Sequence, residues 1–347
     1  MPLKLRGVVN CAAETAAHSK IRLESNTIMS TCLGLNEMGM TMSDTVLVTG
    51  GSGFIGTWVL RELLARNAKP VVVDVQPAPL RWQRVLGGRA AEVVSIEASL
   101  LDRDRLQSVI EQHGVTHVIH LAALLTPECQ KDPWLGCQVN VLGSTALFEA
   151  ARRSGRVRSL AYASSYAVYG PETGNSADES NRPPTFYGAF KQAVDLIAEQ
   201  YWRHFGIASV AVRPHVVYGP ERDQGLTAGP SLAARAAALG ESYTIGYTGR
   251  VGYDYAEDVS RAFVRSAIEC PPGHTVVDLP SELATTEEFR SAIVAAVPDA
   301  ESRIMVNGPA IPSNVPPSPN YISNLFPDWQ ATSLRDGVRK TVEFYQH

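Results

Sequence analysis

Two side chains in the middle of the chain, Tyr187 and Lys191, have the types and the spacing to move a proton. Residues four apart share one face of a helix, and an apolar stripe follows them, so we expect a helix here. An ammonium beside a phenol favours the phenolate, which predicts a pKa for Tyr187 below its usual value of about 10. Such a phenol is a candidate acid/base for interconverting an alcohol and a ketone. The same spacing also occurs on solvated helices, so the interpretation depends on what else the chain carries.

A glycine-rich segment, VLVTGGSGFIG at residues 46–56, is the second informative feature. An apolar strand runs into Gly50, Gly53 and Gly56, and a helix is expected to follow at about Phe54–Ala65. Glycine lets the backbone turn sharply and approach a pyrophosphate, and the first amides of the helix favour that anion. The segment therefore predicts a dinucleotide site, and a tight turn without a ligand is the less favoured alternative.

An acidic residue, Asp74, ends the next apolar strand, 18 residues after Gly56. A carboxylate in this place binds the ribose hydroxyls of NAD and repels the 2′-phosphate of NADP. Arg81 and Arg84 follow a few residues later and could reach that phosphate. The sequence therefore predicts NAD as the cofactor, with NADP as the alternative.

The elements that must position these residues alternate between strand and helix after Thr45, which predicts a parallel sheet covered on both faces. Right-handed crossovers then place the cofactor outside the carboxyl ends of the strands. The expected fold is α/β, a Rossmann-type doubly wound parallel sheet with a smaller C-terminal substrate-binding region. Strands are expected at 46–49, 70–74, 92–96, 116–120, 157–163 and 207–212.

The chain divides into three parts. Residues 1–43 lack clear periodicity and are expected to be a leader outside the fold; no secretory signal is indicated, and a mitochondrial presequence is the weaker alternative. Residues 44–212 form the predicted NAD-binding domain with the catalytic residues. Residues 213–347 form mainly the substrate-binding region, with segments that return to the first domain. Five prolines at 309–319 exclude a long helix or a central strand and predict a surface loop.

Composition limits the classes of function. The chain has 347 residues, of which 45% are hydrophobic, enough for a sizeable core. A net charge of −4 leaves no basic surface for nucleic acid. Five cysteines without metal-binding spacing predict free thiols in a reducing compartment and no metal site. No apolar run has the length of a membrane span, so we expect a cytoplasmic protein without a membrane partner.

Further motifs follow the glycine turn in a fixed order: VIHLAA at 118–123, Asn140 in NVLGSTALFEAAR, ASSYAVYG at 163–170, YGAFK at 187–191 and RPHVVYGP at 213–220. In these pieces the chain resembles the extended short-chain dehydrogenases/reductases, the NAD-dependent epimerase/dehydratase family. The resemblance runs from about Thr45 to the C-terminus. It is far more specific for fold and cofactor than for substrate.

The resemblance implies roles for single side chains. Ser165 would orient the substrate oxygen toward Tyr187, and Lys191 would also bind the nicotinamide ribose. Ser164 is expected to bond backbone instead, and Asn140 has a structural role, with proton relay as the alternative. The remaining cofactor-binding candidates are Phe54, Ile55, Ser99, Leu100, Leu121, Ala122, Ala123, Pro214 and Val216.

The candidates for substrate binding are Thr126, Ser165, Tyr166, His215 and Arg250. For His215, a hydrogen bond to a substrate hydroxyl or carboxylate and plain packing are equally favoured, whereas His120 is expected to be structural. Dehydratases of the family carry an Asp-Glu pair after the active-site hydroxyl. Tyr166 and Ala167 stand there in this chain, which disfavours dehydration.

Three functions fit these residues. The favoured one is an NAD-dependent oxidoreductase that acts on a secondary alcohol of a small polar substrate, such as a sugar, a sugar acid or a hydroxy acid. The first alternative is an epimerase, an isomerase that retains its NAD, with a nucleotide sugar among its candidate substrates. The second is a non-catalytic dinucleotide-binding regulator, disfavoured because such proteins tend to lose the tyrosine or the lysine.

Two departures from the family pattern concern the substrate. Nucleotide-sugar members commonly contact the diphosphate through an asparagine and an arginine, where this chain has Val216 and Val251. Valine neither donates a hydrogen bond nor carries charge, so a non-nucleotide substrate is expected, with Arg250 or Arg222 as substitute contacts. Relatives often dimerise through helices near 140–152 and 187–204, so a homodimer is expected.

Overall fold

The computed structural model describes residues 44–170, 182–311 and 319–347. The predictions for residues 1–43 and for most of the proline-rich stretch fall outside the described residues. No helix among those described has the length and apolarity to cross a membrane. The described part also contains no group of three or more His, Cys, Asp or Glu side chains that could hold a metal ion.

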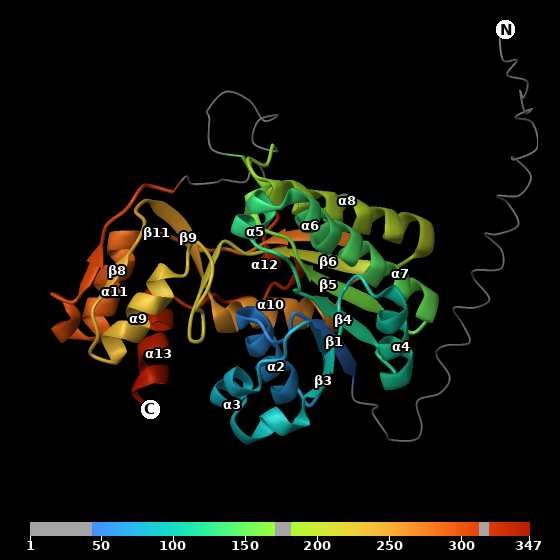
Figure 1. Ribbon diagram of the computed structural model, residues 1–347, viewed down its shortest axis with the longest axis horizontal. Coiled ribbons are helices and arrows are strands. Elements are labelled where there is room, and N and C mark those ends of the chain that lie inside the picture. Colours follow the sequence, from blue (N-terminus) through green and yellow to red (C-terminus); the bar gives the residue numbers. More distant parts are fainter. Residues whose placement is uncertain (1–43, 171–181, 312–318) are drawn as a thin grey trace, which may run out of the picture. The chain divides into compact units, whose positions relative to one another are not determined.

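Seven parallel strands form the main sheet in the order β10-β6-β5-β4-β1-β2-β3 (Figure 1). Their bounds are β1 Thr45–Thr49, β2 Lys69–Asp74, β3 Val94–Glu97, β4 His117–His120, β5 Ser159–Ala163, β6 Ala208–Arg213 and β10 His274–Asp278. The predicted Rossmann-type fold is confirmed, and each of the six expected strands lies within two residues of its predicted bounds. The strand order reverses between β1 and β4, the point at which such sheets bind ligands.

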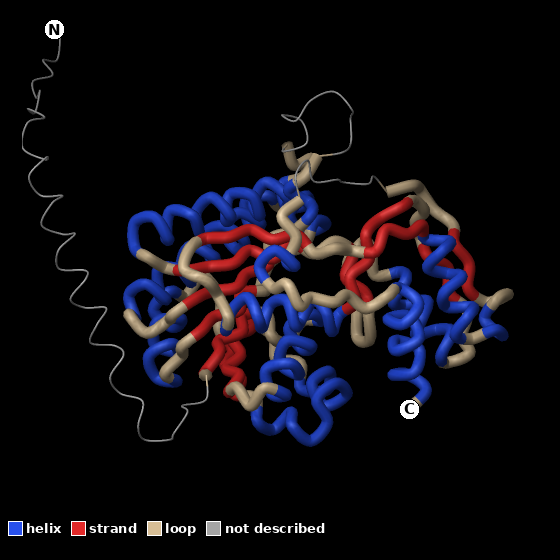
Figure 2. Tube along the Cα trace, turned by 180° about the vertical axis from the view of Figure 1, so that it is seen from behind, coloured by secondary structure: helices blue, strands red, loops and turns tan. Residues whose placement is uncertain are grey.

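Helices cover both faces of this sheet, as the view from behind also shows (Figure 2). One layer contains α2 Phe54–Ala65, α3 Pro79–Leu86 and α10 Ala256–Ile268, and the other contains α4 Arg103–His113, α7 Ser144–Ser154 and α8 Phe186–Phe205. Val46 and Val48 of β1 pack into the first layer, and Leu47 packs into the second. The middle of β1 is therefore a continuous apolar run, Val46–Val48, because both faces of the strand are buried.

Beyond β6 the chain builds a second, smaller group of elements. A three-stranded sheet has the order β11-β9-β7, and a two-stranded sheet pairs β12 with β8. The bounds are β7 Val216–Tyr218, β8 Tyr243–Ile245, β9 Arg250–Tyr255, β11 Glu282–Thr285, β12 Ile304–Val306, α9 Gly229–Ala238, α11 Thr286–Ala296 and α13 Leu334–Gln346. Tyr218, Phe289 and Val338 lie at the centre of their apolar core.

Short elements complete the described chain. They are η1 Gly87–Glu92, α5 Thr126–Lys131, α6 Pro133–Cys137, the π-helical turn η2 Gln138–Gly143, η3 Tyr166–Val168, η4 Pro298–Ala300 and α12 Ile322–Leu325. Both α10 and β10 come from beyond residue 213 yet pack in the main sheet layer. The division of the chain at residue 212 stays a prediction.

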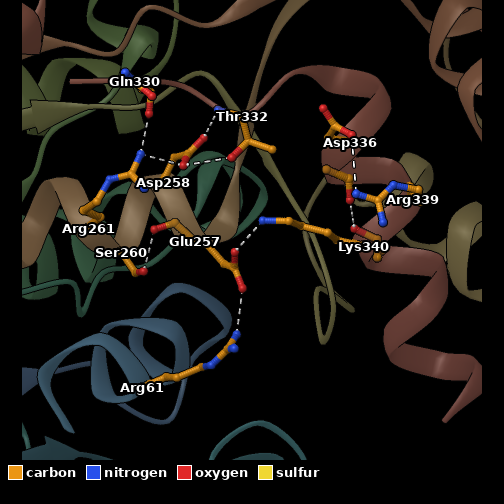
Figure 3. A network of polar contacts seen from close by, with 12 residues as sticks. Arg61, Glu257, Asp258, Ser260, Arg261, Gln330, Thr332, Asp336, Arg339 and Lys340 are labelled. Atoms are coloured by element: carbon orange, nitrogen blue, oxygen red, sulfur yellow. Dashed lines mark hydrogen bonds and ion pairs between the residues drawn. The ribbon is translucent and has the colours of Figure 1, made fainter. Parts of the chain in front are cut away.

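A polar network at the start of α10 joins the two groups of elements (Figure 3). Glu257 accepts hydrogen bonds from Arg61 of α2 at 2.8 Å and from Lys340 of α13 at 3.1 Å. The neighbouring Asp258 is buried and accepts from the amide of Thr332 at 2.6 Å. Exposed ion pairs contribute little to stability one by one. Their positions nevertheless connect α2, which follows the glycine turn, to the C-terminal elements.

Candidate active site

The glycine turn lies between β1 and α2 and is in close contact with other backbone segments. Gly50 has a φ of +73°, a region that favours glycine, and a β-carbon there would lie 2.6 Å from the amide nitrogen of Ala122. A β-carbon at Gly56 would lie 2.6 Å from the Cα of Gly51, so α2 begins against the turn. Gly53 precedes α2 and provides no capping side chain. The first amides of the helix therefore have the arrangement that binds an anion.

Asp74 ends β2 beside this turn, as the sequence predicts. Its carboxylate accepts hydrogen bonds from the amide of Ser52 at 3.1 Å and from the amide of Gln76 at 3.3 Å. These bonds hold the carboxylate next to the glycine turn, where it can accept hydrogen bonds from ribose hydroxyls.

The two arginines that could bind a 2′-phosphate are paired with acids from the loop after β7. Arg81 donates to the carboxylate of Asp223 at 2.6 Å and to the carbonyl of Ser52 at 2.8 Å. Arg84 donates two hydrogen bonds to Glu221, at 2.9 and 2.6 Å. Both guanidinium groups are therefore already neutralised by a carboxylate, which weakens their attraction for a 2′-phosphate.

Asn140 fixes the segment that follows β4. Its side-chain oxygen accepts from the amide of Leu124 at 2.8 Å, and its side-chain nitrogen donates to the carbonyl of the same residue at 2.9 Å. This pair of bonds fixes Leu124, which follows the segment that lies beside Gly50 of the glycine turn. The geometry supports the structural role of Asn140.

The other candidates around the turn also follow carboxyl ends of strands. Ser99 and Leu100 come after β3. Leu100 packs closely against Gly143, where an added β-carbon would lie 2.9 Å from the β-carbon of Leu100. Pro214 comes after β6, and its carbonyl accepts from the amide of Tyr166 at 3.3 Å. Val216 is buried in β7.

His120 is buried at the end of β4, with both ring nitrogens hydrogen-bonded. Nδ1 lies 2.6 Å from the hydroxyl of Thr49, and Nε2 lies 2.8 Å from the hydroxyl of Ser144. Burial lowers the pKa of His120 to about 3. The ring is therefore neutral at physiological pH, consistent with the structural role that the sequence predicts.

Ser165, Tyr187 and Lys191 come together just after the carboxyl end of β5. Ser165 precedes η3, and the other two lie one turn apart at the start of α8. A β-carbon at Gly188 would clash with the carbonyl of Ala167, so α8 begins in direct contact with η3. The side chains of Ser165 and Tyr187 are hydrogen-bonded, and Lys191 Nζ lies 5.6 Å from the centre of the Tyr187 ring. The structure thus brings together the three predicted catalytic residues.

The predicted lowering of the Tyr187 pKa by Lys191 is wrong in this arrangement. Burial raises the pKa of Tyr187 to about 12, against a smaller lowering by the hydrogen bond with Ser165. Lys191 is buried, and its Nζ donates to the carbonyl of Ala163 at 2.6 Å. Burial also lowers the pKa of Lys191 to about 8. At neutral pH Tyr187 is therefore a neutral phenol, and Lys191 remains mostly protonated.

A buried polar network behind this cluster was missed by the sequence analysis. Ser164 donates to the carboxylate of Asp195 at 2.8 Å and accepts from Arg213 at 3.3 Å, so the expectation that it bonds backbone is wrong. Arg213 also donates to Asp195 at 2.6 Å and to the hydroxyl of Tyr169 at 2.7 Å. The available signal was the position of Asp195 four residues after Lys191, on the same face of α8.

Two of the predicted substrate-binding residues are neighbours. The rings of Tyr166 and His215 have their centres 3.8 Å apart. Tyr166 is buried, and its hydroxyl lies 3.4 Å from the carbonyl of Leu279. The amide of His215 donates to the carboxylate of Asp254 at 2.7 Å. These contacts place both residues where the segments after β5 and β6 meet.

The structure does not bring Arg250 into this group. It begins β9, is exposed, and donates to the carbonyl of Leu283 at 3.3 Å. Thr126 begins α5, directly after the segment that Asn140 fixes. Their roles in substrate binding stay predictions.

The chain is similar to nucleotide-sugar epimerases over most of its length. UDP-glucose 4-epimerase of Mycolicibacterium smegmatis is 29% identical over 318 residues, which cover 87% of this chain and 98% of that protein. The UDP-glucose 4-epimerase of Bos taurus is 36% identical over 140 residues, 37% of this chain and 39% of that protein. The crystal structure of the Thermus thermophilus UDP-glucose 4-epimerase with NAD has 26% identity and a TM-score of 0.71, with 87% of this chain and 99% of that chain covered.

The sequence profile of the NAD-dependent epimerase/dehydratase family matches residues 46–277. This range contains the glycine turn, Asp74 and the cluster of Ser165, Tyr187 and Lys191. It confirms the predicted family and its cofactor, NAD. The chain therefore belongs to the NAD-dependent epimerase/dehydratase family.

Proposed function

We propose that this chain transfers a hydride between NAD and the carbon of a secondary alcohol, with Tyr187 as the acid/base. The observation that carries the proposal is the convergence of Ser165, Tyr187 and Lys191 at the edge of the sheet where the glycine turn lies. The carboxyl ends of parallel strands meet at one edge, so a cofactor at the turn and a substrate at Tyr187 are brought together. Retention of all three side chains disfavours a non-catalytic regulator.

Bound NAD supplies the nicotinamide carbon that accepts or returns the hydride. The glycine turn and the first amides of α2 would hold its pyrophosphate, and Asp74 its adenosine ribose. Lys191 would bind the nicotinamide ribose. The other residues proposed to border the cofactor are Phe54, Ile55, Ser99, Leu100, Leu121, Ala122, Ala123, Asn140, Pro214 and Val216.

Proton transfer is the task of this chain's own side chains. In the reducing direction the neutral Tyr187 phenol gives its proton to the substrate oxygen, and in the oxidising direction it takes the proton back. Ser165 hydrogen-bonds Tyr187 and would orient the substrate oxygen. The ammonium of Lys191, 5.6 Å from the ring centre, favours the phenolate that forms when the proton leaves.

The surroundings of two valines support a small polar substrate. Val216 in β7 and Val251 in β9 are buried in the apolar core of the C-terminal elements. Neither can contact a diphosphate as the corresponding residues of nucleotide-sugar enzymes do, because charge-assisted hydrogen bonds need a polar side chain. We therefore favour a sugar, a sugar acid or a hydroxy acid as substrate.

An epimerase that retains NAD is the second candidate, and the comparisons favour it. Two proteins that are similar over 87% of this chain are UDP-glucose 4-epimerases. In an epimerase the hydride returns to the opposite face of the same carbon, so no net oxidation occurs. The catalytic cluster would perform the proton transfer in either case.

The release of NADH separates these candidates. We expect the purified protein to bind NAD reversibly and to accumulate NADH when it oxidises a sugar acid or a hydroxy acid, measured by NADH absorbance. UDP-glucose and UDP-glucuronate are the comparison substrates. If the protein instead carries tightly bound NAD and converts a UDP-sugar to its epimer without free NADH, the epimerase is the correct function.

The homodimer is proposed from a hollow on the face that carries α4, α7 and α8. It is lined by Leu101, Asp102, Arg103, Asp104, Leu142, Thr145, Ala146, Glu149 and Tyr201. Leu142 at its rim is 57% exposed although apolar. Contiguous exposed apolar surface marks interaction sites more often than chance.

A charge at this rim should therefore weaken the dimer. We expect Leu142→Asp to shift the mass measured by light scattering toward the monomer. Leu80→Asp is the matched control, because Leu80 is 68% exposed on α3, in the other helical layer. A wild-type protein that is monomeric at high concentration would contradict the proposal.

The carboxylate of Asp74 should determine the preference for NAD over NADP. We expect NAD to bind more tightly in calorimetric titrations, because Asp74 repels a 2′-phosphate and Arg81 and Arg84 are already paired. Asp74→Ala should narrow the difference between the two affinities. Tighter binding of NADP by the wild-type protein would refute this assignment.

Removing the Tyr187 hydroxyl should abolish proton transfer without removing the ring. General acid/base catalysis contributes typically about 10²–10⁴ in rate, so Tyr187→Phe should lower kcat by that order. Titration with NAD should show that the variant still binds the cofactor. A Tyr187→Phe enzyme with wild-type turnover would show that another group moves the proton.

A further inference from the structure

We infer that Arg222 binds a carboxylate of the substrate. The inference rests on the proposed function, because it assigns a substrate class to the same site. It favours sugar acids and hydroxy acids over neutral sugars. Three properties of Arg222 carry it: the contacts of its guanidinium, its lack of an acidic partner, and its place between two segments of the site.

The guanidinium of Arg222 bonds only neutral acceptors in the described structure. It donates to the carbonyl of Val217 and, at 2.8 Å, to the hydroxyl of Thr227. A guanidinium has five N–H donors, so these bonds orient the group and leave donors for a ligand. Its centre lies 6.0 Å from the centre of the Phe54 ring, at the start of α2.

The acids closest to Arg222 in sequence are engaged elsewhere. Glu221 pairs with Arg84, and Asp223 pairs with Arg81. Among the described residues, the ionisable groups that act on Arg222 are the phenols of Tyr187 and Tyr247, which are neutral at physiological pH. Burial consequently lowers the pKa of Arg222 to about 10. Arg222 is half-buried, and a cation in that position without an acidic partner is stabilised by an anionic ligand.

The loop around Arg222 also contacts the substrate side of the site. A β-carbon at Gly225 would lie 3.6 Å from Arg222 Nη2 and 3.6 Å from Leu125 Cδ1. Leu125 immediately precedes Thr126, a predicted substrate contact. Arg222 thus acts electrostatically on Tyr187 and lies near the start of α5. A substrate with its alcohol at Tyr187 can place a neighbouring carboxylate on the guanidinium, which matches that group in a two-pronged contact.

Two other anions could bind the guanidinium of Arg222. One is the pyrophosphate of NAD, because Phe54 begins the helix next to the glycine turn, and the other is the diphosphate of a nucleotide sugar. We favour the carboxylate because Arg222 Nη2 and Leu125, which precedes Thr126, both lie in contact range of Gly225, on the substrate side of the site. The experiment must separate all three.

Binding without turnover provides the test. Thermal unfolding and calorimetry of the NAD-loaded protein would compare D-glucuronate with D-glucose, and D-glycerate with glycerol, at matched ionic strength. UDP-glucose would serve as the diphosphate probe. We expect at least one acid to stabilise the wild-type protein more than its neutral partner, since a ligand that binds only the folded state raises its stability.

Arg222→Gln should weaken binding of that acid by about tenfold to a hundredfold, the range for a lost hydrogen bond to a charged group. Its affinity for NAD should stay unchanged. Arg222→Lys keeps the charge and should lose less affinity. The matched control is Arg156→Gln, which removes an exposed arginine from the loop before β5, away from the carboxyl ends of the strands, and should bind the acid as the wild type does. Thermal unfolding of each variant without a substrate probe would show whether the variant is folded. If Arg222→Gln is not folded, the affinity of Arg222→Lys for the acid provides the test instead.

Four outcomes would overturn the inference. They are no stabilisation by any acid, equal binding of acid and neutral partner, wild-type acid binding by Arg222→Gln, and loss of NAD or UDP-glucose affinity in that variant with acid binding intact. Tyr187→Phe should keep the preference for the acid over its neutral partner, because Arg222 is unchanged in this variant. Turnover measurements therefore test the proposed hydride transfer, and binding measurements separately test the contact between Arg222 and the carboxylate.

Discussion

A buried ion pair between Arg213 at the end of β6 and Asp195 in α8 connects the elements that carry the catalytic residues. Its atoms are 2.6 Å apart, and both side chains are largely shielded from water. Ser164 joins the pair through two hydrogen bonds, so the end of β5, next to Ser165, is held by the same charges. Breaking a buried pair by removing one partner costs about 3–5 kcal/mol. The alignment of β5 with α8, and hence of Ser165 with Tyr187, depends on this pair remaining intact.

The same network extends to parts of the chain that are distant in sequence. Arg213 donates to the hydroxyl of Tyr169, which in turn donates to Asp278 at the end of β10. Asp278 also accepts from the amide of Asn320 at 3.2 Å. A single set of buried polar groups thus connects β5, β6, β10 and the segment after residue 319. These side-chain contacts add to the parallel backbone pairing of β10, which comes from the C-terminal half, with β6 in the main sheet.

The fold and much of the site geometry could be predicted because they depend on local patterns. Apolar strands buried on both faces leave continuous runs such as VLVT, and the turn after β1 needs glycine where Gly50 and Gly56 approach other backbone segments. Contacts between distant segments leave no such signal. Nothing in the local sequence around Ser164 indicates that it meets Asp195 and Arg213. The pairing of Arg84 with Glu221 likewise depends on how the loop after β7 folds back over α3.

The pKa of Tyr187 shows why charge balance in particular could not be predicted from spacing. Two residues one helical turn apart are neighbours, but the ammonium of Lys191 is directed to the carbonyl of Ala163, and burial raises the pKa of the phenol. The same desolvation acts against charge on Lys191 and Arg222, whose pKa values it lowers. Because Tyr187 stays protonated while Lys191 and Arg222 carry positive charge, the site has a local excess of positive charge. Negative charge is therefore most favoured there, either on the Tyr187 oxygen during proton transfer or on a carboxylate held by Arg222.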